Sequence, residues 1–243
     1  MESKRLNKAI SETGFCSRRE ADRLIESGKV KVNGEVVGLG VQVSSNDRIE
    51  VDGQLITKEV PNIYLAFHKP VGITCTTDTS KKDNIVDFIN FPERIFPIGR
   101  LDKPSEGLIF MTNDGDIVNK ILRAGNNHEK EYIVNVNRKI TKAFIRQMSN
   151  GVPILDTVTK KCRVERINDF TFKIVLTQGL NRQIRRMCSH LGYEVNRLKR
   201  VRIMNIELGN LIRGEYRHFT PDELNEINRL VANSSKTAEA SED

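Results

Sequence analysis

The stretch GRLDKPSEGLIFM, residues 99–111, joins an irregular loop to a short apolar run. Glycine and proline keep its first half out of regular structure, because glycine reaches unusual φ angles and proline lacks an amide donor. The run LIFM has the length and composition of a buried strand. Asp102 therefore lies on a loop beside a rigid element, a position where catalytic groups are frequent. An aspartate in such a loop is also a common turn former, so spacing alone does not make it catalytic.

The chain around this loop has strand patterns with interspersed helix patterns. The expected strands cover residues 64–67, 108–111, 132–136 and 172–176, and the expected helices surround residues 117–122 and 144–148. A last helix begins after Thr220, because Thr220 and Glu223 form a capping box with Pro221 at the first helical position.

A further helix is expected from about Asn181, and it is rich in arginine. Its apolar residues recur at helical spacing and form one buried stripe, namely Ile184, Met187, Cys188 and Leu191. Arg182, Arg185 and Arg186 lie off this stripe, where they could face a phosphate backbone or an active-site carboxylate. A plain basic surface helix would show the same pattern.

The first fifty residues predict a separate helix–helix–hairpin unit. Ser17 and Glu20 have the spacing of a capping box, and the helix that follows ends at Gly28. Alternating valine and lysine then run into Asn33-Gly34, which is a strong signal for a tight hairpin. A second such turn is expected at Asp52-Gly53, and residues 58–62 read as a linker.

The net charge of +7 over 243 residues is unevenly distributed. Residues 182–202 hold seven Lys or Arg against one acid, a net +6, and residues 1–34 hold eight against five, a net +3. Such clustering favours a polyanionic partner, although a solvated surface would have the same composition.

Several classes of protein do not fit the sequence. No apolar stretch reaches the roughly 18 residues needed to cross a bilayer, and the N-terminus has no apolar signal segment. The four cysteines are far apart without a CxxC pair, which predicts reduced thiols in the cytoplasm and no zinc site. A P-loop, a Rossmann glycine pattern and a histidine cluster are likewise missing from the sequence, so we expect no cofactor and no metal.

Four motifs in fixed order resemble the pseudouridine synthases. They are Lys69-Pro70-Val71-Gly72, the loop GRLDKPSEGL, Lys130-Glu131-Tyr132 and the arginine motif NRQIRRM of residues 181–187. The N-terminal unit is similar to the small RNA-binding domain named after ribosomal protein S-four. Together they resemble the RsuA-type ribosomal RNA branch of the family. One departure is Lys103-Pro104, where many relatives have a polar or acidic pair.

The resemblance assigns roles to the matching positions. It makes Asp102 the essential carboxylate, Arg185 the cation that keeps it ionised and Tyr132 the platform for the target base. Arg100 would fill the space that the flipped base leaves, and Ile184 would line the pocket, with Lys69 and Pro70 as structural support. The remaining RNA-binding candidates are basic residues: Arg182, Arg186, Arg5, Lys8, Arg18, Arg19, Arg23, Lys29 and Lys31.

The resemblance implies an isomerase that turns a specific uridine of structured RNA into pseudouridine without a cofactor. The expected substrates are large-subunit ribosomal RNA and a tRNA anticodon stem-loop. A monomer would bind them across the long, mostly antiparallel mixed sheet of an α+β catalytic domain. The expected limits are residues 1–60 for the small domain, 63–231 for the catalytic domain and 232–243 for a disordered tail. The alternatives are a non-catalytic ribosome-assembly factor, an RNA methyltransferase and a tRNA synthetase.

Overall fold

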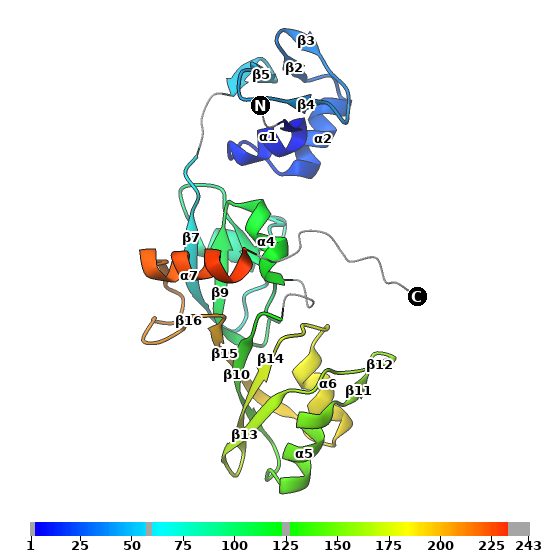
Figure 1. Ribbon diagram of the computed structural model, residues 1–243, viewed down its shortest axis with the longest axis vertical. Coiled ribbons are helices and arrows are strands. Elements are labelled where there is room, and N and C mark those ends of the chain that lie inside the picture. The colour runs from blue at the N-terminus through cyan, green and yellow to red at the C-terminus, as the bar shows by residue number, and fades with distance from the viewer. Residues whose placement is uncertain (1–2, 57–59, 123–126, 233–243) are drawn as a thin grey trace. The chain divides into compact units, whose positions relative to one another are not determined.

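The computed structural model describes residues 3–56, 60–122 and 127–232, and these form two compact units (Figure 1). One unit contains the chain up to Ile63 together with the short segments Pro92–Arg94 and Asn113–Gly115. The other unit contains the rest of the described chain. No helix among the described residues is both long enough and apolar enough to span a membrane.

The N-terminal unit packs two helices against short antiparallel strands. Its four-stranded sheet has the order β3-β2-β5-β6, and β1 pairs with β4 separately. Apolar residues from the helices and strands form its core, among them Leu6, Ile10 and Ile25. The elements are α1 (Leu6–Glu12), α2 (Arg18–Glu26), β1 (Lys4–Arg5), β2 (Val30–Val32), β3 (Glu35–Val36), β4 (Gln42–Val43), β5 (Ile49–Val51) and β6 (Gln54–Ile56).

Both predicted tight turns are confirmed. Asn33 and Gly34 have φ angles of 54° and 91°, and Asp52 and Gly53 have φ angles of 52° and 78°. Two consecutive positive φ angles define the type I′ turn that suits the twist of a hairpin.

The predicted capping box of α2 forms only in part. The Ser17 hydroxyl accepts from the Glu20 amide at 3.1 Å, as expected. The Glu20 carboxylate, however, pairs with Arg23 at 3.0 Å. An arginine one turn further along the helix therefore competes for this carboxylate, a contact that the capping pattern ignores. The box that begins α7 is complete, since Thr220 and Glu223 cap each other's amides.

The second unit is built on a nine-stranded mixed sheet, as predicted for an α+β fold. Its order is β13-β14-β10-β15-β9-β7-β17, with β16 paired to β15 and β8 paired to β9. The strands are β7 (Tyr64–Lys69), β8 (Phe96–Ile98), β9 (Glu106–Thr112), β10 (Lys130–Val136), β13 (Arg163–Asn168), β14 (Thr171–Leu176), β15 (Val195–Ile203), β16 (Ile206–Glu207) and β17 (Tyr216–His218). The helices are α3 (Ile85–Ile89), α4 (Gly115–Leu122), α5 (Lys142–Asn150), α6 (Gln183–His190) and α7 (Pro221–Val231), and a small hairpin joins β11 (Pro153–Ile154) to β12 (Thr157–Val158).

The two halves of this sheet meet where β9 runs parallel to β15. Their register pairs Lys199 with Glu106 and Arg200 with Gly107, and every other strand pair of the sheet is antiparallel. Gly107 has a φ angle of +117°, and a Cβ added there would lie 2.2 Å from the carbonyl oxygen of Arg200. Only glycine permits this approach, so the signature loop ends in a residue that the sheet itself requires.

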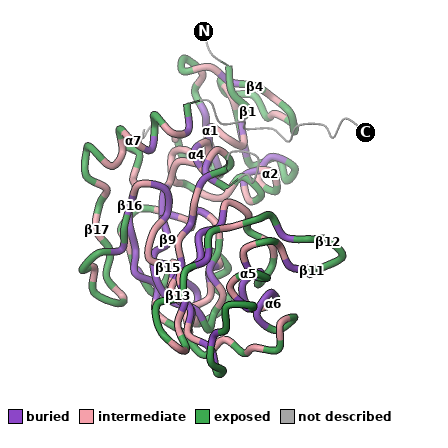
Figure 2. The backbone as a smooth tube through the Cα atoms, turned by 60° about the horizontal axis from the view of Figure 1, so that its bottom comes forward, coloured by how far each residue is buried: buried purple, intermediate pink, exposed green. Residues whose placement is uncertain are grey.

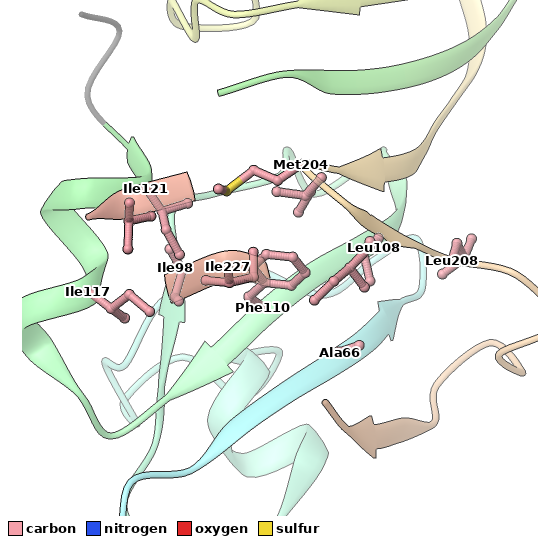
Figure 3. Close-up of a cluster of buried hydrophobic side chains, with 12 residues drawn as sticks. Ala66, Ile98, Leu108, Phe110, Ile117, Ile121, Met204, Leu208 and Ile227 are labelled. Carbon is pink, nitrogen blue, oxygen red and sulfur yellow. The ribbon is translucent and has the colours of Figure 1, made fainter. Parts of the chain in front are cut away.

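Each half of the sheet has its own helical cover. All seven residues of β9 are buried, and Figure 2 labels this strand on the backbone coloured by burial. Helices α4 and α7 pack on the half that contains β7 and β9, where Ile117 and Ile227 belong to one buried cluster with Phe110 (Figure 3). On the other half, Phe144 of α5 packs edge-on against Phe172 of β14, with ring centroids 5.3 Å apart.

Candidate active site

A cleft of about 530 Å³ opens at the junction of the two halves of the sheet. The loop that precedes β9, strands β10 and β15, and the segment that leads into α6 all contribute to its walls. Of the candidate catalytic and RNA-binding residues, those that line it are Arg100, Asp102, Tyr132, Arg182, Ile184 and Arg185. Arg186 is exposed on α6 and bonds to the backbone and side chain of Asn181.

The loop that carries Asp102 is held at several points. The Cys75 thiol donates to the Leu101 carbonyl at 3.2 Å, and its sulfur accepts from the Leu101 amide at 3.3 Å. The Ser105 amide closes a turn onto the carbonyl of Asp102 at 2.9 Å. Lys69, which is fully buried, donates to the Ser105 carbonyl at 2.8 Å. These contacts fix the backbone around a carboxylate whose side chain remains 33% exposed.

Arg185 approaches Asp102, but its hydrogen bonds go elsewhere. Its Nε lies 3.9 Å from Asp102 Oδ2. One terminal nitrogen donates to the carbonyl of Val195 at 3.2 Å, and the other donates to the carbonyl of Pro104 and the hydroxyl of Ser105 at 3.1 and 3.0 Å. The buried Nε has no hydrogen-bond partner among the described residues. Arg185 thus approaches the carboxylate without a hydrogen bond to it among the described residues, and its own hydrogen bonds tie α6 to the loop.

The electrostatics of the pair follow from burial. Desolvation lowers the pKa of Arg185, neighbouring Arg182 lowers it further, and Asp102 raises it. A guanidinium keeps its proton under all such conditions, so Arg185 remains a cation beside Asp102.

Tyr132 lies on the cleft wall and is 9% exposed. In the strand register its neighbours are Ile174 of β14 and Arg200 of β15. The guanidinium carbon of Arg200 lies 6.0 Å from the centroid of the tyrosine ring. One face of the aromatic ring is thereby close to a buried cation within a cavity large enough for a nucleobase.

The basic run between Arg182 and Arg202 differs from the expectation of one charged surface. Four of its seven basic residues lie on β15, a strand in the middle of the sheet that the sequence patterns did not predict. Arg197 pairs with Glu106, and Arg202 pairs with Glu129 and Glu131 at 2.8 and 3.3 Å. Arg200 is 4% exposed and donates to the carbonyl of Leu108 at 2.6 Å. These side chains have protein partners, which a count of charges along the sequence does not reveal.

Two buried charged groups, one beside the cleft loop and one on the cleft wall, were not assigned a role from the sequence. Glu106 belongs to the signature loop, is 2% exposed, and is paired with both Arg197 and Arg213. Lys130 lines the cleft and is 9% exposed. The alternation of β10 offered a signal for Lys130, because it occupies an inward position of a strand whose other inward residues are Tyr132 and two valines.

None of the described residues forms a group of three or more His, Cys, Asp or Glu side chains that could hold a metal ion. All four cysteines are free thiols.

The chain thus combines a basic N-terminal unit with a second unit that has the features of a catalytic domain, namely a cleft and a loop that carries a carboxylate. The chain belongs to the RNA pseudouridylate synthase family, whose sequence pattern matches residues 63–190. The S4 domain family matches residues 4–49. Family membership makes it an enzyme of the isomerase class and excludes the methyltransferase and synthetase alternatives.

Similar proteins cover nearly the whole chain. The dual-specificity RNA pseudouridine synthase RluF of Escherichia coli K12 is 60% identical over 96% of this chain and 81% of its own length. The ribosomal large subunit pseudouridine synthase B of Bacillus subtilis is 36% identical over 96% and 99%. A crystal structure of a pseudouridylate synthase superposes with a TM-score of 0.67 at 30% identity, covering 93% of this chain and 99% of that one.

The resemblance of this chain to large-subunit ribosomal RNA pseudouridine synthase F rests on the stretches NHEKEY, VPILDTVTKKC and GLNRQIRRMC. The 60% identity to RluF agrees with that resemblance.

Proposed function

We propose that Asp102 is the catalytic carboxylate of this enzyme. The observation that supports it most is its position in the cleft, where the 3.9 Å approach of Arg185 is its only side-chain polar contact among the described residues. Its oxygens are therefore available to a substrate.

The reaction needs no redox chemistry. The bond between C1′ and N1 of uridine breaks, the uracil turns, and C1′ joins C5, while C5 loses a proton and N1 gains one. Asp102 would either attack C1′ or remove a proton from the sugar. Both routes require a carboxylate beside the sugar of a uridine that has left its stack.

The other residues of the cleft have roles that suit this step. Tyr132 would stack on the extruded uracil, and Ile184 would form the apolar wall beside it. Arg100 is exposed at the rim and would fill the space that the base vacates. Arg182 and Arg186 are exposed at the start of α6, and we assign them to the RNA backbone.

The N-terminal unit would hold the RNA by its phosphates. We propose residues 1–60 as this binding domain and residues 63–231 as the catalytic domain. The proposed disordered tail, residues 232–243, lies outside the described residues apart from Ala232. The basic residues of the N-terminal unit that we propose as phosphate contacts are Arg5, Lys8, Arg18, Arg19, Arg23, Lys29 and Lys31.

We further propose that the substrates are large-subunit ribosomal RNA and a tRNA anticodon stem-loop, modified in the cytoplasm by a monomer. The support is the similarity to RluF, which is named for dual specificity. Mapping pseudouridines in ribosomal RNA and tRNA from a deletion strain, with and without the restored gene, tests both substrates. A tRNA whose pseudouridines are unchanged would remove the second one.

The catalytic assignment is tested with Asp102→Asn, which removes the charge and keeps the shape. We expect tritium release from labelled RNA to fall by about 10²–10⁴-fold or more, with RNA affinity and melting temperature nearly unchanged. Asp78→Asn is the matched control, because Asp78 is an exposed aspartate of the same unit. A variant at position 102 that keeps a substantial fraction of the rate would refute the assignment. A wild-type protein that binds RNA without tritium release would favour the ribosome-assembly factor.

A further inference from the structure

Lys130 is a buried cation on the wall of the cleft. Strand β10 alternates strictly, so Lys130, Tyr132, Val134 and Val136 share its buried face. Lys130 and Tyr132 both line the cleft. Positions two apart on a strand lie about 7 Å from each other, which places the amine within reach of a base that rests on the tyrosine ring.

The amine of Lys130 has hydrogen-bonding capacity left over. Its one hydrogen bond among the described residues goes to the His128 carbonyl at 3.3 Å, although an ammonium group has three donors. It forms no ion pair with any described carboxylate. A buried cation without a counter-charge is costly, and proteins usually avoid it unless a ligand compensates.

Lys69 provides an internal comparison. Both lysines are buried, and burial lowers the pKa of each to about 8. Lys69 donates to the carbonyls of Pro70 and Ser105, both at 2.8 Å, and it does not line the cleft. Lys69 is thus satisfied by the fold, whereas Lys130 faces a cavity with donors available.

Charge develops in this cleft during the reaction. When the bond between C1′ and N1 breaks, its electron pair leaves with the uracil, and the negative charge spreads over N1, O2 and O4. The ring must then turn before C5 can meet C1′. An ammonium group on a flexible stem suits this task, because it acts as a compact charge with rotatable donors and can follow ring oxygens as they move.

We propose that Lys130 Nζ donates a hydrogen bond to a ring oxygen of the extruded uracil and stabilises the uracil anion while it turns. The inference rests on the proposed function, in which the target base lies against Tyr132. Lys130 keeps its proton throughout. The proton that C5 loses and the one that N1 gains are exchanged by other groups.

The first test is single-turnover kinetics at saturating enzyme for Lys130→Met and Lys130→Arg. Loss of one donor to a developing anion typically costs about 100- to 1000-fold in rate, and we expect this for Lys130→Met. RNA affinity should stay within about threefold. Lys130→Met removes a buried charge and should fold, because replacing buried charge by apolar volume is often neutral or stabilising. Its melting temperature provides that check.

The pH profile separates this role from a structural one. The wild-type rate should fall once Lys130 loses its proton, at or above pH 8, because RNA phosphates raise the pKa of a nearby ammonium in the complex. Lys130→Arg should be slower than wild type but should lack this alkaline limb, since a guanidinium stays charged. The other charged groups around the cleft and its wall are Arg100, Asp102, Lys103, His128, Arg182, Arg185 and Arg200. Burial lowers the pKa of His128 from 6.5, so its titration lies in a lower pH range.

The contact with the base itself is tested by 2-thiouridine or 4-thiouridine at the target position, because sulfur accepts hydrogen bonds more weakly than oxygen. One of the two should slow the wild type by about tenfold and leave Lys130→Met nearly unaffected. A Lys130→Met rate within threefold of wild type would overturn the proposal. So would a loss confined to affinity with a lower salt slope, which would indicate a phosphate contact. Activity retained by Asp102→Asn in the same assay would instead refute the assignment of the cleft.

Discussion

The N-terminal unit and β15 are both rich in basic residues, yet the surroundings of these residues differ. In the N-terminal unit, Arg23 pairs with Glu20 while their side chains are 76% and 47% exposed. On β15, Arg197 pairs with Glu106, a carboxylate that is only 2% exposed. An exposed pair is worth little and can exchange its carboxylate for a phosphate, whereas a pair with a buried carboxylate supports the fold. Charge density along a sequence therefore does not measure contact with RNA.

The largest effect should come from Glu106→Gln. This change removes the shared partner of Arg197 and Arg213, and two charge-assisted interactions of about 1.5 kcal/mol each give a loss of about 3 kcal/mol in unfolding free energy. Burial works to raise the pKa of Glu106, but the arginines prevail and lower it. The stabilisation is therefore present above about pH 4.3, the ordinary glutamate value, and is lost as the pH falls through the folded pKa.

Urea titrations of both proteins at several pH values would show this. Their unfolding free energies should differ at pH 7 and converge in acid. A gap that is the same at pH 7 and pH 3 would mean that the carboxylate charge is not what stabilises the sheet.

The next effect concerns α6 and its N-cap, because Arg182 is exposed whereas Arg185 is half-buried. Arg185→Lys should slow single turnover by about 10- to 100-fold, because one ammonium cannot span the acceptors of Val195, Pro104 and Ser105 that the planar guanidinium reaches. Arg182→Lys is the matched control and should change the rate less than about threefold, since a phosphate accepts from either cation. Equal rates for the two variants would make Arg185 an ordinary phosphate contact.

A smaller effect is expected for the exposed charges of the N-terminal unit. Arg19→Gln and Lys31→Gln should each lower the slope of log affinity against log salt by about 0.7–0.9, if each residue contacts one phosphate. Arg197→Gln, made on β15, should leave this slope unchanged and reduce stability instead. Binding titrations from 50 to 300 mM salt measure the slopes. A salt slope that falls for Arg197→Gln and not for Lys31→Gln would mean that β15, and not this part of the N-terminal unit, contacts the RNA phosphates.

The smallest effect should be that of Glu20→Gln, the exposed counterpart of Glu106→Gln. Its ion pair with Arg23 is solvent-exposed, so the unfolding free energy should change by no more than about 0.5 kcal/mol. Ser17→Ala on the same helix should cost about 1 kcal/mol, because the Ser17 hydroxyl is the group that caps the Glu20 amide. In thermal melts, Ser17→Ala should lower the melting temperature more than Glu20→Gln does. The reverse order would indicate that the Glu20 carboxylate caps the Ser17 amide, as in a full capping box.

Local chemistry explains what the sequence could predict. Tight hairpin turns need positive φ angles, and the residue pairs Asn33-Gly34 and Asp52-Gly53 predict such angles from two residues alone. Helix starts depend on one hydroxyl and a nearby amide, as at Thr220. The motifs likewise bring Asp102, Tyr132 and Arg185 to one cleft, since each lies beside an element whose pattern is strong.

What could not be predicted depends on partners distant in the chain. Strand β15 has arginines where a central strand of a sheet should have apolar residues, and acceptors such as Glu106, Glu129, Glu131 and the carbonyl of Leu108 make that acceptable. The bonds of Arg185 go to a strand and a loop that no local pattern connects to α6. Such satisfaction of buried polar groups appears only when the strands are paired.

The parallel junction at Gly107 also determines when the site can assemble during translation. It joins Glu106 to Lys199, 93 positions later in the chain (199 − 106). At about 5–20 residues per second, a ribosome needs roughly 5–20 s to make the intervening segment. Until α6 and β15 have both emerged, the loop of Asp102 lacks Arg185 and Glu106 lacks Arg197, so the site cannot be assembled. The N-terminal unit can fold well before that time, and a nascent chain would hold RNA before it could modify it.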